Sequence, residues 1–89
     1  MAMASVTLDS TWQQVFDGTV GNVIIQASAS CMLAIATSAP GAGTEVGIKL
    51  RERPQGAGYE FASGGLLGQK IYMRETSGEN NAVATIASW

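Results

Sequence analysis

The chain has 89 residues, a net charge of −2, one cysteine and no histidine, and 13% of its residues are charged. This length allows one domain, 1–89, and the composition excludes an intrachain disulfide, a Cys/His zinc cluster and the basic patch of a nucleic-acid-binding surface. Ordinary domains are roughly 25% charged. A small domain without disulfide or metal is stabilised by partners, so we expect this chain to associate.

The first ten residues contain no basic residue and no apolar core, so they do not form a signal peptide. No apolar run approaches the roughly 18–20 residues that span a bilayer. We therefore expect synthesis in the cytoplasm of the producing cell and no membrane partner. Residues 1–4 are expected to form a flexible or docking arm.

Two short strands are predicted near the start of the chain. Residues 5–8 alternate weakly between polar and apolar, and residues 11–16 carry β-branched and aromatic side chains. A helix that begins at Asp9 or Ser10 is the alternative. Glycines soon after limit that helix to two turns, so a strand is favoured.

The longest apolar stretch, residues 22–40, predicts two strands joined by a Ser/Ala turn into a central hairpin. The first strand is Val23–Ala27 and the second is residues 31–37. Each strand has one large-aliphatic face and one face of smaller residues. A continuous helix over 28–39 is the alternative, which the β-branched content disfavours. The large face contains Val23, Ile25, Cys31, Leu33 and Ile35, and the smaller face of the second strand contains Met32, Ala34 and Ala36.

The rest of the chain predicts further short strands separated by glycine-rich or polar turns. Residues 46–51 show the cleanest alternation, and residues 59–61, 69–75 and Ala82–Ser88 follow. A polar turn at 76–81 predicts a closing hairpin. Seven to eight short, mostly antiparallel strands predict an all-β fold, a single small β-sandwich or barrel.

The sequence contains no constellation of residues that indicates catalysis. Four glutamates fall on outward strand positions or in turns, where we expect solvated carboxylates. Cys31 has no histidine partner and is predicted to be a small buried hydrophobe. We therefore expect no enzymatic activity, no cofactor, no metal and no small-molecule substrate. The four glutamates are Glu52, Glu60, Glu75 and Glu79.

The aromatic residues are predicted to lie in the core or at an interface. The alternative is a sugar-stacking platform formed from the six aromatic residues, in which Trp12, Tyr59 and Tyr72 are the exposed residues that would bind a glycan. The small-residue face of the apolar stretch is also expected to be covered by a neighbouring subunit or by a second sheet. The candidate interface residues are Trp12, Met32, Ala34, Tyr72 and Trp89.

Four segments resemble small β-sandwich structural proteins of tailed-bacteriophage virions. They are residues 20–26 (VGNVIIQ), 34–40 (AIATSAP), 47–50 (GIKL) and 71–78 (IYMRETSG). The resemblance implies a virion component of the capsid-decoration, cement or head-fibre type, without enzymatic activity. It also implies a homo-oligomer, a homotrimer in particular, that docks on a major capsid or other virion protein. A tail or fibre component that binds a host receptor or glycan is the alternative.

Overall fold

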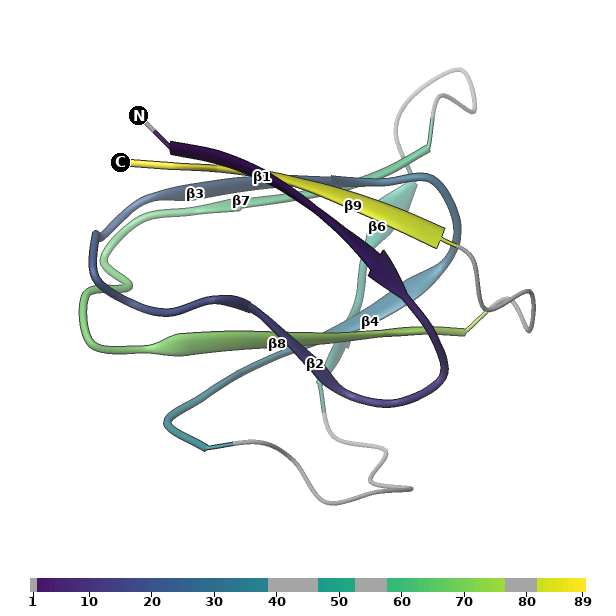
Figure 1. The fold of residues 1–89 in the computed structure, drawn as a ribbon, viewed down its shortest axis with the longest axis horizontal. Helices are drawn as coiled ribbons and strands as arrows, with labels where there is room; N and C mark the ends of the chain where they lie inside the picture. The colour runs from purple at the N-terminus through teal and green to yellow at the C-terminus, as the bar shows by residue number, and fades with distance from the viewer. Residues whose placement is uncertain (1, 39–46, 53–57, 77–81) are drawn as a thin grey trace.

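The computed structural model describes residues 2–38, 47–52, 58–76 and 82–89, which form a two-layer β-sandwich (Figure 1). The nine strands in these residues are β1 (Ala2–Leu8), β2 (Gln13–Phe16), β3 (Val23–Ala27), β4 (Cys31–Ala36), β5 (Ile48–Lys49), β6 (Arg51–Glu52), β7 (Tyr59–Ser63), β8 (Lys70–Glu75) and β9 (Ala82–Ser88). Only Leu50 separates β5 from β6, so these two strands form one run. The predicted all-β sandwich is confirmed.

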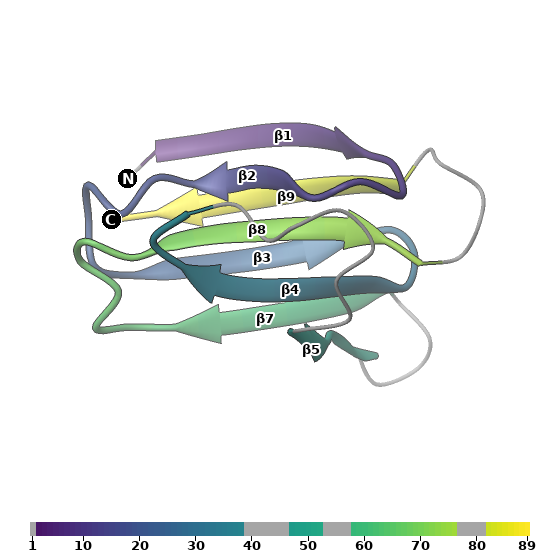
Figure 2. The same ribbon diagram turned by 90° about the horizontal axis from the view of Figure 1, so that it is seen from below.

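The strands divide into two sheets, and every pairing among the described strands is antiparallel. Sheet A has the order β1-β9-β3-β7-β6, and sheet B has the order β2-β8-β4-β5. Figure 2 shows β1 at the outer margin of the sandwich, next to β2 and β9. From Ala2 onward, the residues expected to form an arm belong to β1, in which Ala2 pairs with Ser88.

The apolar stretch does not form the predicted hairpin. β3 pairs with β7 and β9 in sheet A, whereas β4 pairs with β5 and β8 in sheet B. Residues 28–30 therefore form an arch that carries the chain from one layer to the other. The predicted closing hairpin is wrong for the same reason, because β8 and β9 also lie in different sheets.

Hydrogen bonds from distant strands hold this arch. The Ser28 N–H donates to the carbonyl of Val83 (3.1 Å), and the Val83 N–H donates to Oγ of Ser28 (2.9 Å). On the other side of the arch, the Thr76 N–H donates to the carbonyl of Ser30 (2.9 Å). The Ser/Ala turn thus connects the start of β9 to the end of β8, which explains why it bends between the layers.

The core lies between the sheets and follows the alternation of the strands. The predicted inward face of β3 is confirmed, since Val23 and Ile25 are fully buried. Cys31 and Leu33 of β4 are also buried, but Ile35 is 43% exposed. Among the described residues, β5 pairs with Met32 and Leu33 and does not extend to Ile35.

Two aspartates form tight turns at the ends of β2. Oδ1 of Asp9 accepts hydrogen bonds from the Thr11 hydroxyl and N–H, and these bonds lower the pKa of the carboxyl below its usual 3.8. Asp17 accepts from the N–H (3.1 Å) and hydroxyl (2.8 Å) of Thr19, which lower its pKa in the same way. These turns favour a strand between them, and no helix begins at Asp9 or Ser10.

Two loops close one end of the sandwich by bonding to each other. The Gly68 N–H donates to the carbonyl of Gly18, and the Leu66 N–H donates to the carbonyl of Gly21, both at 2.9 Å. Leu66 is buried in the core. A Cβ at Gly18, which has φ +78°, would overlap the backbone of Gln69 and lie 2.9 Å from its nitrogen. This close approach requires glycine at position 18.

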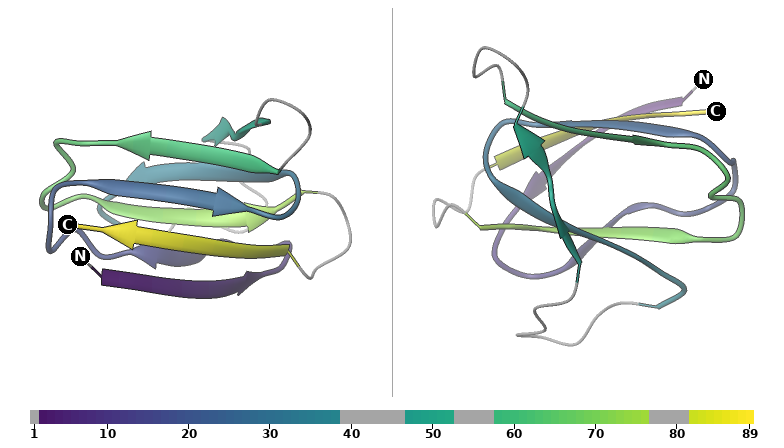
Figure 3. Two further views of the ribbon diagram at one scale, coloured as in Figure 1. Left: turned by 90° about the horizontal axis from the view of Figure 1, so that it is seen from above. Right: turned by 180° about the vertical axis from the view of Figure 1, so that it is seen from behind.

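The run through Leu50 crosses between the layers at the far side of the sandwich (Figure 3, right). β5 pairs with β4 in sheet B, and β6 pairs with β7 in sheet A. Leu50 between them is buried, and its N–H donates to the carbonyl of Cys31 (3.1 Å). The described residues include no helix long and apolar enough to cross a membrane.

Candidate association surfaces

Four of the five candidate interface residues lie together on the outer face of sheet B. Ala34 is directly opposite Tyr72 in the β4–β8 pair, and Met32 is opposite Arg74. The Arg74 guanidinium lies 5.4 Å from the centre of the Trp12 ring, which is the geometry of a cation–π contact. We call the group of Trp12, Met32, Ala34 and Tyr72 the Trp12 face.

Trp12 lies directly before β2, and its side chain extends across sheet B towards β5. A Cβ at Gly47 would lie 3.3 Å from Cη2 of Trp12. Nε1 of Trp12 is buried, and no acceptor among the described residues bonds to it. A buried donor without a partner costs roughly 1–3 kcal/mol. The ring is therefore held in place by packing and by Arg74 rather than by its polar group.

The Trp12 face is already largely covered within one copy of the chain. Ala34 and Tyr72 are each only 6% exposed, although neither faces the other sheet. The Tyr72 hydroxyl lies 3.5 Å from Oε1 of Gln14. Tyr59 belongs to β7 of sheet A and packs against the core, so Trp12, Tyr59 and Tyr72 do not form one platform for stacking on a sugar.

Four of the large exposed apolar side chains, Met3, Ile24, Val83 and Trp89, belong to the outer face of sheet A, whereas Ile35 and Ile48 lie in sheet B and Leu67 lies in a loop. Met3 is opposite Ala87, Ala87 is opposite Ile24, and Ile24 is opposite Ala62, so one apolar line crosses four strands. Met3 is 68% exposed and Ile24 is 39% exposed. Together with Trp89, these residues make up what we call the apolar row: Met3, Ile24, Ala62, Ala87 and Trp89.

Trp89 lies beside the other members of this row, just beyond β9, in the opposite layer from the Trp12 face. Its N–H and carbonyl form hydrogen bonds with the carbonyl and N–H of Asn22, at 3.1 and 3.0 Å. Two positions beyond Ala87 on the same face, its ring is a diagonal neighbour of Ile24, within the reach of an aromatic side chain. It is 44% exposed. The fifth candidate residue therefore does not join the other four.

Met3 and Ile24 were not among the candidate residues. The sequence nevertheless contains a signal for Ile24, because alternation in Val23–Ala27 places it opposite to the buried Val23 and Ile25. Met3 had no such signal, because residues 1–4 were assigned to an arm rather than to a strand. A large apolar residue on the exposed face of a predicted strand is the sequence feature that indicates this surface.

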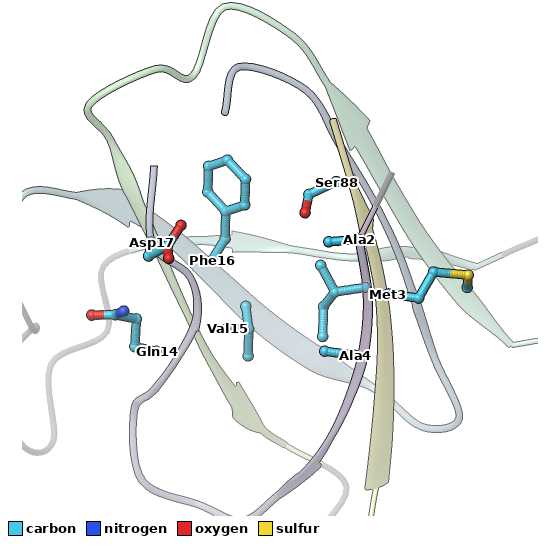
Figure 4. A pocket seen from close by; sticks show the side chains of 9 residues that line it. Ala2, Met3, Ala4, Gln14, Val15, Phe16, Asp17 and Ser88 are labelled. Atoms are coloured by element: carbon cyan, nitrogen blue, oxygen red, sulfur yellow. The ribbon is translucent and has the colours of Figure 1, made fainter. Parts of the chain in front are cut away.

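A hollow of about 240 Å³ lies between β1 and β2 at the margin of the sandwich (Figure 4). Phe16 and Ile86 contribute apolar walls, and Ala2 and Ala4 line it from β1. Figure 4 shows Met3 turned away from it. Asp17 is the charged residue in the lining, and its carboxylate is already bonded to its own turn. The hollow therefore offers little for recognition of a polar ligand.

The buried pair Cys31 and Glu75 lies inside the sandwich, directly opposite each other on β4 and β8. Cys31 is fully buried, as predicted, and its thiol donates to the carbonyl of Ala29 at 3.2 Å. Burial, and secondarily the charge of Glu75, raise the pKa of Cys31 to about 11. The thiol therefore stays protonated at neutral pH, which suits packing and not nucleophilic attack.

The prediction that Glu75 is a solvated carboxylate is wrong, since Glu75 is 2% exposed. The alternation that buries Ile71 and Met73 continues to the last residue of β8. Glu60 is partly buried in β7, whereas Glu79 and the side chain of Glu52 lie outside the described residues. Within the described ranges, no three His, Cys, Asp or Glu side chains are grouped so that they could hold a metal ion.

Comparisons with protein-family models, with curated proteins and with solved structures found no match to this chain.

Proposed function

We propose that this domain is a structural accessory protein of a bacteriophage virion, a capsid decoration or cement protein that self-associates and docks on capsid subunits. The observation that supports docking is the apolar row, an exposed line of uncharged side chains across the outer face of sheet A. The virion setting comes from the resemblance of its sequence segments to virion proteins. We propose that the protein is made in the host cytoplasm and then resides on the virion.

The apolar row has the chemistry of a small docking surface. Its larger members, Met3 and Trp89, are residue types enriched at protein interfaces. The next line of residues across the same face is polar and consists of Ser5, Thr85, Gln26 and Glu60. An apolar centre beside a polar margin is the usual anatomy of a protein–protein contact. Its natural counterpart is a shallow apolar surface on a capsid subunit.

The proposed mechanism is additive burial. Fully burying a large apolar side chain stabilises a complex by roughly 1.5–3 kcal/mol. Part of each side chain in the row is already covered, so one copy binds with modest strength. Many copies on a shell, each joined to a second copy, gain avidity because the second contact is made within one assembly. The decoration then braces neighbouring capsid subunits against separation.

Co-sedimentation with empty shells of the major capsid protein from the same genome tests this proposal. Ile24→Lys places a charge in the apolar row and is expected to weaken binding at least tenfold, since a charge buried without a partner is costly. Gln14→Lys makes the same charge change on the outer face of sheet B and should bind like wild type. Wild-type protein that does not sediment with shells refutes the proposal. If only Gln14→Lys loses binding, the capsid contact lies on the Trp12 face and not on the apolar row.

A further inference from the structure

The edges of the two sheets differ sharply in their protection against pairing with another strand. In the described part of the chain, β5 and β6 are two-residue edges that contain charged residues, and β2 is a four-residue edge with a register shift. β1 is a seven-residue edge with an unbroken register, and it contains no charged residue and no proline. Short length, charge and bulges are the features that usually block edge pairing. β1 has none of them.

The register identifies which backbone groups of β1 face outward. Asn22 and Trp89 exchange two hydrogen bonds, so Trp89 and alternate residues of β9 bond towards β3. The remaining residues of β9, including Ser88 and Ile86, bond towards β1, where their partners are Ala2 and Ala4.

The other residues of β1 therefore direct three N–H and three C=O groups towards the open edge. They are Met3, Ser5 and Thr7. Backbone groups of this kind are bonded to water or to another strand.

We propose that β1 pairs antiparallel with β1 of a second copy of this chain, with Ser5 opposite Ser5 and Met3 opposite Thr7 of the partner. In this register all outward groups of both strands bond, which gives six hydrogen bonds about a two-fold axis. A shift of the partner by two residues leaves four. The inference rests on the proposed self-association and specifies its geometry. The product is a dimer, rather than the trimer that the resemblance implies.

The side chains of β1 fit this register. On the outer face Met3 lies beside Thr7 of the partner, and on the inner face Ala4 lies beside Val6 of the partner, so each larger side chain meets a smaller one. β1 itself contains no charged side chain, and hence none is repelled or stripped of water within the paired segment. The continuous ten-stranded sheet presents the apolar rows of both copies on the same side. This arrangement is what docking on a shell requires.

A seven-residue strand pair buries less than the roughly 1,600 Å² of a standard interface. We therefore expect a concentration-dependent dimer between about 10 µM and 1 mM, the range of weak specific contacts. Sedimentation equilibrium of the wild-type protein measures this directly. A chain that is monomeric at about 1 mM, or that forms a trimer, overturns the inference.

A matched pair of variants tests the position of the axis. Ser5→Lys places two like charges opposite each other at the axis and is expected to weaken dimerisation at least tenfold. Gln26→Lys makes the same change on the same outer face and in the same line of residues, two strands from the edge. It should dimerise like wild type. A Ser5→Lys protein that melts like wild type and dimerises with the wild-type dissociation constant overturns the inference.

Hydrogen exchange of the wild-type protein gives a second test that requires no substitution. The N–H groups of Ala4 and Val6 bond to β9 and should be protected at every concentration. Those of Met3, Ser5 and Thr7 should become protected only as the protein concentration rises. A dimer in which these three exchange at an unchanged rate overturns the pairing.

The two proposals can fail separately. If the protein is monomeric but still sediments with shells, only the proposed strand pairing is refuted. If the wild-type protein dimerises, Ser5→Lys weakens the dimer and neither protein binds shells, only the proposed virion function is refuted.

Discussion

Alanine at Gly18 and at Gly68 is expected to destabilise the protein by very different amounts. Both residues have positive φ, +78° and +84°, so alanine adds a similar backbone cost of about 1–2 kcal/mol at each. The gain from a less flexible unfolded chain is also the same. The surroundings differ, because a Cβ at Gly68 meets nothing within 4 Å, whereas at Gly18 it meets the backbone of Gln69.

The overlap at Gly18 adds a second cost. Backbone cannot rotate away as a flexible side chain can, so the loop must shift and strain the Gly68-to-Gly18 hydrogen bond. Overpacking of this kind costs about 1–3 kcal/mol. We expect a loss of about 1–2 kcal/mol for Gly68→Ala and about 2–5 kcal/mol for Gly18→Ala. The second loss is a large part of the roughly 4–13 kcal/mol available to a chain of this length.

Urea denaturation followed by circular dichroism measures both losses, provided that the slopes of the two transitions agree. Thermal melts give the same order, since 1 kcal/mol corresponds to about 4–8 °C in a domain of this size. Equal losses in the two variants would refute the close approach of the loops. A larger loss for Gly68→Ala would refute the packing described at this end of the sandwich.

Three further substitutions or titrations test other parts of the structure. Trp12→Phe removes a buried unpaired N–H and should leave the free energy of unfolding unchanged or raise it by up to about 1 kcal/mol. Trp12→Ala should lower it by about 3 kcal/mol, as measured by urea denaturation. A lower free energy of unfolding in Trp12→Phe would show that the N–H has a partner. Because folding raises the pKa of Cys31 from 9.0 to about 11, stability should be complete below pH 9 and fall by about 2 kcal/mol as pH rises to 11. Cys31→Ala should abolish this fall in stability. If stability falls by the same amount in Cys31→Ala, another group is responsible. NMR titration should find the pKa of Asp9 below 3.8, so its contribution is present at neutral pH and lost as pH falls through the folded pKa. Thr11→Val should bring the pKa back towards 3.8, and no change would contradict the turn.

Alternation along each strand predicted local structure well. The bounds of Val23–Ala27 and Ala82–Ser88 and the buried face of Val23–Ala27 follow from the sequence. Alternation does not say which strand lies beside which. A hairpin and an arch between layers both bury the large face of residues 23–37. The arch is stabilised by hydrogen bonds from Val83 and Thr76 to the turn. These residues are distant in the sequence, so no local pattern predicts the bonds.

The candidate surface was partly predictable for the same reason. Met32, Ala34 and Tyr72 share a face because each lies on an outward position of its strand, and Trp12, just before β2, joins them through its contact with Arg74. Trp89 was grouped with them by residue type, although it belongs to the other sheet. Once neighbouring strands cover a face, hydrophobicity alone no longer indicates exposure. Tyr72 is buried while Met3 is open, and only the tertiary arrangement separates them.

The unequal edges of sheet A determine where growth of an assembly stops. Pairing at β1 consumes the long uncharged edge of both copies. The ends that remain are β6, two residues each, with Arg51 and Glu52 in their sequence. A sheet with two edges like β1 would polymerise, since every addition would leave another open template. Because the far edge is a poor template, the proposed assembly would stop at the dimer, and the same asymmetry would limit the risk of fibril formation.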